Sequence, residues 1–309
     1  MLAMVYDNRF HALGSARQKS KGAEGAKAGF QRIVETIRAA LKDAKIAPSQ
    51  LAGIGIAVPG PVNPAKGVVV EMPNLGWHNF RLREMLSGVF RCRVSVLNDV
   101  DAGTYGEYRF GAGKGGHCVL GVFPGTGIGG GCVYKGDLLQ GATRSCMEIG
   151  HIRIQPDGPR CGCGGRGCLE ALASRLAISA AASAAAYRGS APTLLKETGT
   201  SLKDVRSGAL ATSIKAGDTA IVALVHDASR WLGIAIGSVV NLLNPDIVVL
   251  GGGLVTALPN VFLKGVREAC DETVMKSFRK TYKIAVATLG DEATCQGAAA
   301  WAMKAGVSG

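Results

Sequence analysis

The pattern that most constrains the fold is an alternation of short apolar strands and amphipathic helices that starts twice along the chain. Apolar residues recur at helical spacing over residues 23–45, and the apolar runs 51–58 and 94–97 indicate buried strands. A glycine-rich linker, GAGKGG, begins at Gly111, and a new strand is expected at residues 118–123. Alternating strands and helices predict an α/β architecture with a largely buried sheet. Because the pattern restarts after the linker, we expect an internal duplication.

The opening run MLAMVY, residues 1–6, also predicts a buried strand. Its strand-then-turn pattern is repeated at residues 132–137, which follow the glycine turn GTGIGGG at 125–131. Only in the second copy does a glycine turn precede the strand. Residues 137–170 are expected to be rich in loops. We expect further strands at residues 68–70, 247–250 and 284–289, and helices at 82–90, 102–110, 171–187, 218–243 and 293–305.

Length and composition predict a soluble globular protein. A chain of 309 residues with 47% hydrophobic content can bury a sizeable core, in two domains rather than one. The opening apolar run meets Asp7 after six residues, which is too short for a signal peptide. The longest apolar stretch, residues 231–243, is well under the roughly 20 residues that span a bilayer, so it predicts a buried core helix. Nine cysteines in a chain without a secretion signal favour a reducing compartment, and we expect the cytoplasm. Because the longest apolar stretch is too short for a bilayer, we expect no membrane partner.

The net charge of +12 raises the question of nucleic-acid binding. Lysines and arginines are scattered along the chain, and only 6% of residues are aromatic. Nucleic-acid readers usually combine a contiguous basic face with aromatic residues or a recognition motif. We therefore predict no nucleic-acid partner, and a solvated basic surface that also suits anionic substrates.

The strongest chemical signal is a cluster of three cysteines and one histidine, His151, Cys161, Cys163 and Cys168. Three thiolates and one imidazole satisfy tetrahedral zinc, and the glycines in CGCGGRGC let the loop fold tightly around the ion. Four protein ligands leave no open position, so the predicted Zn²⁺ is structural. The alternative is a set of reduced cysteines in a flexible loop.

Several motifs that occur in order along almost the whole chain resemble those of the ROK family, the repressors, open reading frames and sugar kinases. The zinc loop, with EIGH at residues 148–151 and CGCGGRGCLE at 161–170, is the most specific part of the resemblance. The other motifs are PGPV at 59–62, PNLGW at 73–77, LND at 97–99, GTGIGGG at 125–131 and VLGGGL at 249–254.

The resemblance implies a duplicated actin/hexokinase-like (ribonuclease H-like) α/β fold, with two domains around a central cleft. The smaller domain is then expected to comprise residues 1–110 and the C-terminal helix at about 292–309. Residues 111–291 are expected to form the larger domain, which carries the zinc loop.

The resemblance also assigns a catalytic base, Asp99. A sugar hydroxyl is a poor nucleophile, and a carboxylate at the end of a strand can take its proton during attack on a γ-phosphoryl group. The alternative is that Asn98-Asp99 is merely a turn that ends a strand. Where the family often has asparagine, this chain has Asp101, and a second carboxylate there would raise the pKa of Asp99.

Sugar recognition needs several convergent hydrogen-bonding groups, because each hydroxyl both donates and accepts. By resemblance, His151 would hold zinc through one ring nitrogen and face the sugar with the other, so that the metal shapes specificity without entering the chemistry. A solvated loop carboxylate is the alternative for each glutamate. The substrate-binding residues implied are Gly60, Asn74, Asn98, Asp99, Glu148, His151 and Glu170.

Two glycine-rich turns are expected to bind the nucleotide. Backbone N–H groups and a hydroxyl of the first turn would face phosphates, and the second would let adenosine lie close to the backbone. Tight turns alone explain most such sequences. The residues implied are Gly125, Thr126, Gly127, Gly251, Gly252 and Gly253.

One family motif has no counterpart in these 309 residues. The family's first phosphate motif, of the form DxGGTK, lies on a glycine hairpin immediately before the strand assigned to residues 1–6. Without its aspartate and backbone donors, the electrostatic stabilisation of phosphoryl transfer should weaken. Without its strand, we expect an exposed sheet edge beside residues 1–6.

The resemblance implies a glucokinase-like enzyme of carbohydrate metabolism and glycolysis, which uses ATP with Mg²⁺, or polyphosphate, to make glucose 6-phosphate. Domain closure would exclude water from the reaction. Mannose, fructose or an N-acetylated amino sugar are alternative substrates. A non-catalytic sugar-binding protein and a sugar-responsive regulator are the functions that compete with a kinase. The partners expected are a hexose, a nucleotide and further copies of the chain, in a homodimer or higher homo-oligomer.

Overall fold

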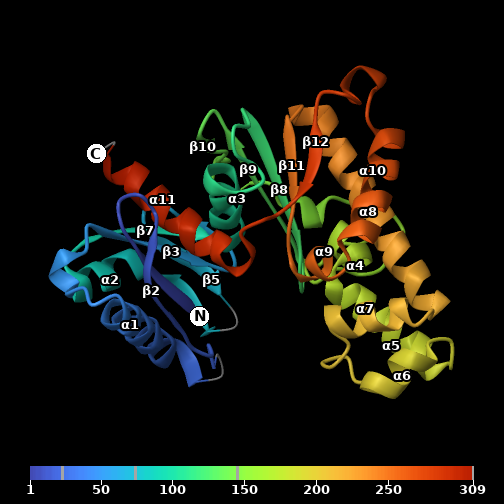
Figure 1. The fold of residues 1–309 in the computed structure, drawn as a ribbon, viewed down its shortest axis with the longest axis horizontal. Coiled ribbons are helices and arrows are strands. Elements are labelled where there is room, and N and C mark those ends of the chain that lie inside the picture. Colours follow the sequence, from blue (N-terminus) through green and yellow to red (C-terminus); the bar gives the residue numbers. More distant parts are fainter. Residues whose placement is uncertain (22–23, 73–74, 144–145, 308–309) are drawn as a thin grey trace. The chain divides into compact units, whose positions relative to one another are not determined.

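The structure is a computed structural model that describes residues 1–309 except 22–23, 73–74, 144–145 and 308–309 (Figure 1). The chain divides into two compact units. The first comprises Met1–Lys114, Asp137–Cys146 and Asp291–Gly309, and the second comprises Gly115–Gly136 and Met147–Gly290.

The first unit is built from short strands covered by three helices and the chain's last helix. Its helices are α1 (Gly25–Asp43), α2 (Leu82–Phe90), α3 (Asp99–Phe110) and α11 (Ala293–Val307), with a 3₁₀ turn at Pro48–Gln50. Its strands are β1 (Leu2–Tyr6), β2 (Ala12–Arg17), β3 (Gly53–Val58), β4 (Val62–Asn63), β5 (Val68–Met72), β6 (Trp77–Phe80), β7 (Arg93–Asn98) and β10 (Asp137–Leu138).

Apart from β10, which pairs with β9, the strands of the first unit form three small sheets. Strands β1 and β2 make an antiparallel hairpin, β3 and β7 run parallel, and β4, β5 and β6 form an antiparallel meander. Helix α1 packs on β1 and β2, and α11 packs across β3, β7 and β1. The apolar core of this unit includes Trp77, Leu82 and Leu86, which are fully buried.

The second unit has one mixed sheet and most of the helices. Its strands are β8 (Cys118–Pro124), β9 (Ile128–Tyr134), β11 (Ile247–Leu250) and β12 (Lys283–Val286). Its helices are α4 (Leu169–Ala173), α5 (Arg175–Tyr187), α6 (Pro192–Thr198), α7 (Ser207–Lys215), α8 (Thr219–Leu243), α9 (Gly253–Ala257) and α10 (Pro259–Thr273), with 3₁₀ turns at Ile149–His151 and Lys276–Phe278. A further 3₁₀ turn, Gly290–Glu292, lies where the chain passes back to the first unit.

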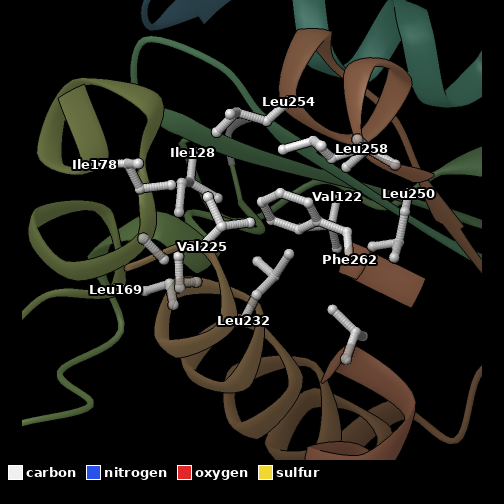
Figure 2. Close-up of a cluster of buried hydrophobic side chains, with 14 of the residues drawn as sticks. Val122, Ile128, Leu169, Ile178, Val225, Leu232, Leu250, Leu254, Leu258 and Phe262 are labelled. Carbon is white, nitrogen blue, oxygen red and sulfur yellow. The ribbon is translucent and has the colours of Figure 1, made fainter. Parts of the chain in front are cut away.

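Strand β8 is the centre of the second unit's sheet. It pairs antiparallel with β9 and parallel with β11, and β11 pairs parallel with β12. Helices α8 and α10 pack against each other beside the sheet. Figure 2 shows how Val122 of β8, Leu232 of α8 and Phe262 of α10 meet in the core, where all three are fully buried. This continuous apolar core holds the ends of β8 and β11 in fixed positions.

Among the described residues, the first unit has no counterpart of the second unit's central strand, β8. In the second unit β8 joins β9 to β11. In the first, β1 pairs with β2 and β3 pairs with β7, and among the described residues no strand joins β1 to β3. Helix α11 nevertheless packs on both β1 and β3. Among the described residues the second edge of β1 is therefore unpaired, and its exposure to solvent stays a prediction.

Local polar contacts move several element boundaries away from their expected positions. The helix expected over residues 171–187 is divided at Ser174, whose extended backbone (ψ 157°) ends α4 and whose Oγ accepts a hydrogen bond from Ala177 N at 3.1 Å to begin α5. Helix α3 begins at Asp99 rather than residue 102, because Asn98 caps it. The run 128–131, expected as part of a turn, is already strand.

Some elements were absent from the sequence expectations. Strand β2 is one, because ALGSAR has little apolar alternation and is held by its pairing with β1. Helix α10 is another, although its N-terminal Pro259 is typical of a helix start. The shorter elements that were missed are β4, β6, α6, α7 and α9.

Two helical stretches, Leu169–Tyr187 and Thr219–Leu243, are long and apolar enough to cross a membrane by length and composition alone. The second is α8, which contributes Val225, Leu232 and Ile236 to the core of its unit. The expected core helix at residues 231–243 is confirmed as part of α8. A buried core helix passes the same test as a membrane span, so this finding is weak evidence for a membrane.

Candidate functional site

The expected catalytic base lies at the first turn of α3, in the first unit. Asn98 is the N-cap residue: its Oδ1 accepts hydrogen bonds from Val100 N at 2.8 Å and Asp101 N at 3.2 Å. The Oδ1 of Asp99 accepts from Val100 N at 3.0 Å. The LND motif is thus the junction between strand β7 and helix α3, and not a simple strand-ending turn.

Burial raises the pKa of Asp99, and the backbone N–H of Val100 opposes the shift only in part. The expected influence of Asp101 on this pKa does not appear, since desolvation is the cause of the rise. A carboxylate that is desolvated in this way is a stronger proton acceptor than one in water. The raised pKa suits the general-base role expected for Asp99, which stays a prediction here.

The PGPV turn lies directly beside the Asp99 turn. Gly60 accepts a hydrogen bond at its carbonyl oxygen from Asn98 Nδ2 at 3.1 Å. Its φ of +90° and its close approach to the carbonyl of Glu71 both favour glycine. An amide nitrogen carries two hydrogens, so this contact leaves a sugar-bonding role for Asn98 open. Asn74, the remaining predicted sugar ligand of this unit, lies outside the described residues.

The four predicted metal ligands meet in the second unit. Their ligand atoms all lie within 4.8 Å of one another. Nδ1 of His151 is 3.7 Å from Sγ of Cys161, and the Sγ atoms of Cys163 and Cys168 are also 3.7 Å apart. In a tetrahedral zinc site with Zn–S bonds of about 2.3 Å, neighbouring sulfur atoms lie about 3.8 Å apart. The donor set and its spacing therefore fit zinc.

Burial keeps two of the thiols, those of Cys161 and Cys168, protonated at neutral pH unless a cation binds. Desolvation raises the pKa of Cys168 to about 11 and raises that of Cys161. Thiolates gathered in this way repel one another unless a metal ion neutralises them. The backbone is arranged around the cluster by hydrogen bonds from Cys161 N to Gly165 O and from Gly164 N to Cys161 O, at 2.9 and 3.0 Å.

The predicted sugar-binding residues of the second unit lie on two segments that run next to each other. Glu148 precedes the 3₁₀ turn that ends at His151, and His151 N donates to Glu148 O at 2.9 Å. Glu170 lies in the first turn of α4. A backbone bridge between Arg153 and Cys168 joins the two segments. The structure thus brings Glu148, His151 and Glu170 into one neighbourhood.

Glu170 connects this neighbourhood to the first glycine turn. Its Oε2 accepts a hydrogen bond from Ile128 N at 3.0 Å, and its Oε1 lies 3.8 Å from Sγ of Cys161. A Cβ at Gly127 would clash with the same carboxylate. Glu170 is therefore held between the zinc ligands and the GTG turn, and is not a solvated loop carboxylate.

The two predicted nucleotide turns lie at the same edge of the sheet. Residues 125–127 follow β8 and residues 251–253 follow β11, and these strands are parallel neighbours. At Gly252, φ is +90° and a Cβ would clash with the carbonyl of Pro124. Ligands of α/β sheets bind at the carboxyl ends of parallel strands, where such turns leave room beside the backbone.

Sequence reasoning missed a set of cations beside these turns. Arg175 donates from Nη2 to Thr126 Oγ1 at 2.8 Å and from its backbone N to Gly125 O at 2.9 Å. It also lines a cavity of about 790 Å³. No motif marks these residues, although Arg175 follows the cap residue of α5 directly. The cavity is lined by Arg175, Leu176, Leu202, Lys203, Arg206, Ser207 and Gly208.

Comparison with known proteins decides the family. The ROK family profile matches residues 6–305, which is nearly the whole chain. The chain belongs to the ROK family. A glucokinase from Thermotoga maritima is 34% identical to this ROK protein over 271 residues, which cover 87% of this chain and 83% of the glucokinase.

Solved structures agree with this assignment. A ROK glucokinase from Streptomyces griseus, in complex with glucose and AMPPNP, matches with a TM-score of 0.84 and 28% identity, and the match covers 97% of this chain and 95% of that one. A ROK family transcriptional regulator, a homolog of the E. coli MLC protein, matches with a TM-score of 0.84 and 25% identity, covering 99% of this chain and 76% of the regulator. The expected actin/hexokinase-like α/β fold is confirmed.

Proposed function

We propose that this ROK protein is an ATP-dependent hexose kinase that converts glucose to glucose 6-phosphate. Asp99 is the observation that carries the proposal: a desolvated carboxylate with a raised pKa, fixed at the start of α3 in the family's LND motif. The similarity to glucokinases from two organisms supports the same activity.

In the proposed reaction, Asp99 accepts the proton of the sugar's 6-hydroxyl as that oxygen attacks the γ-phosphorus of ATP. The bond between the γ-phosphorus and the β,γ-bridging oxygen breaks, and ADP leaves. Asn98 keeps Asp99 in place, because its side chain caps α3 and binds the carbonyl of Gly60. Gly60, Asn74 and Asn98 are the proposed sugar contacts of the first unit.

The second unit is proposed to bind the nucleotide through its two glycine turns. Backbone N–H groups and the hydroxyl of Thr126 face the phosphates, and residues 251–253 face the adenosine. Magnesium bound with ATP neutralises phosphate charge. The cavity beside the GTG turn, with Arg175, Lys203 and Arg206 in its lining, supports this assignment because three cations favour a polyanion.

Glucose specificity is proposed to come from Glu148, His151 and Glu170. Carboxylates accept hydrogen bonds from sugar hydroxyls, and the second ring nitrogen of His151 supplies a further partner. A structural zinc ion held by His151, Cys161, Cys163 and Cys168 would fix the tautomer and orientation of that ring. The close spacing of the four ligand atoms supports this metal assignment.

A coupled ADP-release assay on the purified protein tests the proposal. The substrates compared are glucose, mannose, fructose, N-acetylmannosamine and N-acetylglucosamine, each with ATP or polyphosphate as donor. We expect the highest kcat/KM for glucose with ATP. If glucose binds by calorimetry and no hexose is phosphorylated with either donor, the protein is a non-catalytic sugar-binding protein and the kinase assignment is wrong.

We further propose that the enzyme works as a homo-oligomer in the cytoplasm, in carbohydrate metabolism and glycolysis. All nine cysteines are free thiols in the structure, which suits a reducing compartment. Light scattering of the purified protein tests the oligomeric state, and a mass equal to one chain contradicts it.

A further inference from the structure

The zinc loop lines a second, separate cavity, open at the surface, that the proposed kinase reaction does not use. Its volume is about 310 Å³, at the lower end of the range for small-molecule sites. Three arginines line it, namely Arg153, Arg160 and Arg166, and the other lining residues are Pro156, Gly164 and Gly165. The proposed nucleotide cavity is lined by an entirely different set of residues.

Backbone contacts hold the three arginines on a defined frame. Arg160 and Arg166 face each other across an antiparallel bridge, and Arg153 forms a second bridge with Cys168. Gly167 N donates to Pro159 O at 2.8 Å, next to the first bridge. The positions from which these guanidinium groups extend are therefore fixed before any ligand binds, which reduces the entropy lost on binding.

The residues that line the cavity include three positively charged side chains and no acidic one. Asp157 is the one carboxylate in residues 151–168, and it is not part of the lining. Within the described part of the chain, none of the three arginines forms an ion pair with a carboxylate. Three guanidinium groups around a small cavity attract an oxyanion strongly, because each presents a planar fork of N–H donors that matches phosphate oxygens.

We propose that this cavity binds a small phosphate-bearing anion, such as pyrophosphate or a sugar phosphate. The cavity also depends on the metal site: Arg160 precedes Cys161, and Arg166 lies between Cys163 and Cys168. We expect metal binding to stabilise further the backbone that carries these two arginines. Because His151 is both a metal ligand and a proposed sugar contact, an anion in this cavity would stiffen the loop that positions it.

Isothermal titration of the zinc-loaded protein at constant ionic strength tests the proposal. The probes are inorganic phosphate, pyrophosphate and glucose 6-phosphate, each added with saturating AMPPNP so that the nucleotide site is filled. We expect at least one probe to bind. The preferred probe distinguishes a free phosphate from a phosphorylated sugar. If none binds to the wild-type protein, the proposal is wrong.

Single variants then locate the binding site. We expect Arg160→Gln and Arg166→Gln each to weaken the affinity about tenfold, the usual effect of losing one charged hydrogen-bonding partner. Arg188→Gln is the matched control, because Arg188 is an exposed arginine at the end of α5 in the same unit. Unchanged affinity in both Arg160→Gln and Arg166→Gln would overturn the proposal.

Metal content separates anion binding from a role in neutralising the zinc thiolates. Each variant is analysed for zinc beside its affinity. Loss of zinc with unchanged anion affinity shows that the arginines serve only the metal, and contradicts the proposal. If zinc and anion are lost together, Arg153→Gln decides, because Arg153 lies outside the 161–168 cysteine segment: weaker anion binding at normal zinc content supports the proposal, and unchanged binding overturns it.

Discussion

At the scale of single residues, the junction of β7 and α3 shows how one carboxylate acquires its chemistry. Asn98 caps the helix and holds Gly60, so Asp99 begins the first turn with its side chain partly desolvated. Burial favours the protonated form of Asp99, and the hydrogen bond from the backbone N–H of Val100 favours the ionised form. Burial dominates, because the pKa of Asp99 rises.

The variant Asp99→Asn tests this residue directly. We expect kcat for glucose phosphorylation to fall by at least about 100-fold, the lower end of what a positioned base contributes. Glucose affinity should stay within about tenfold, because the amide keeps the size and most hydrogen bonds of the carboxylate. Stopped assays and glucose titration measure both. Retained turnover would remove the assignment of Asp99 as the base.

The same variant should be more stable than the wild type at neutral pH. A carboxyl with a raised pKa in the folded state binds more protons when folded than when unfolded, so stability falls as pH rises through that interval. At pH 7 the ionised Asp99 therefore costs stability, and asparagine removes that cost. Thermal unfolding should show a higher Tm for Asp99→Asn at pH 7 and a smaller difference from the wild type at acid pH.

The pH profile of the wild type gives an independent check on the base. As pH falls, kcat/KM should decrease because only the ionised form of Asp99 accepts a proton. The apparent pKa of this decrease should be higher than the ordinary aspartate pKa of about 3.9. Steady-state rates on glucose across acidic buffers locate the limb. Full activity down to about pH 4 would contradict a raised pKa for the base.

At the scale of elements, the glycine turns and the zinc loop are held by packing between segments far apart in sequence. The carboxylate of Glu170, in the first turn of α4, accepts a hydrogen bond from the backbone N–H of Ile128 at the start of β9. The bridge between Arg153 and Cys168 ties the 3₁₀ turn at Ile149–His151 to α4. We therefore expect a change in the zinc loop to disturb the proposed sugar and phosphate contacts through these two connections.

The variant Cys163→Ser tests the loop. We expect wild-type protein to contain about one equivalent of zinc, and the variant to lose the metal and several degrees of Tm, because a structural metal contributes folding free energy. Elemental analysis and thermal unfolding measure both. Cys92→Ser is the matched control, since Cys92 lies in the first unit, away from the ligands. A wild type that is stable and free of metal would contradict the zinc assignment.

Hydrogen exchange tests whether the unpaired edges of β1 and β3 are open to solvent. Strand β8 pairs on both sides, whereas β1 pairs only with β2 and β3 only with β7 among the described residues. We expect amides of β1 and β3 to exchange faster than those of β8 and β11, because unpaired strand edges expose their N–H groups to water. Mass spectrometry of peptides from each strand measures this. Equal protection in the four strands would show that the edges are covered.

At the scale of the whole molecule, the chain divides into two compact α/β units. The internal duplication expected from the restart after Gly111 stays a prediction, whereas the helix at residues 82–90 was predicted with its observed bounds. Motif spacing also anticipated the metal ligands, because short loop segments can bring three cysteines together without help from distant elements. Strand β2 and helix α10 were missed, because pairing and packing with distant elements stabilise them.

Sequence alone therefore determined the family, the order of the main elements and the grouping of the four candidate zinc ligands, because these depend on local patterns and motif spacing. The catalytic role of Asp99 and the bound zinc ion stay predictions. Tertiary structure decided the rest. It alone brought Glu170 to the GTG turn, placed Arg175 on Thr126, and gathered Arg153, Arg160 and Arg166 around one cavity. Those groupings arise because distant segments pair through their backbones. The residue pattern within one segment does not predict which side chains this pairing brings together.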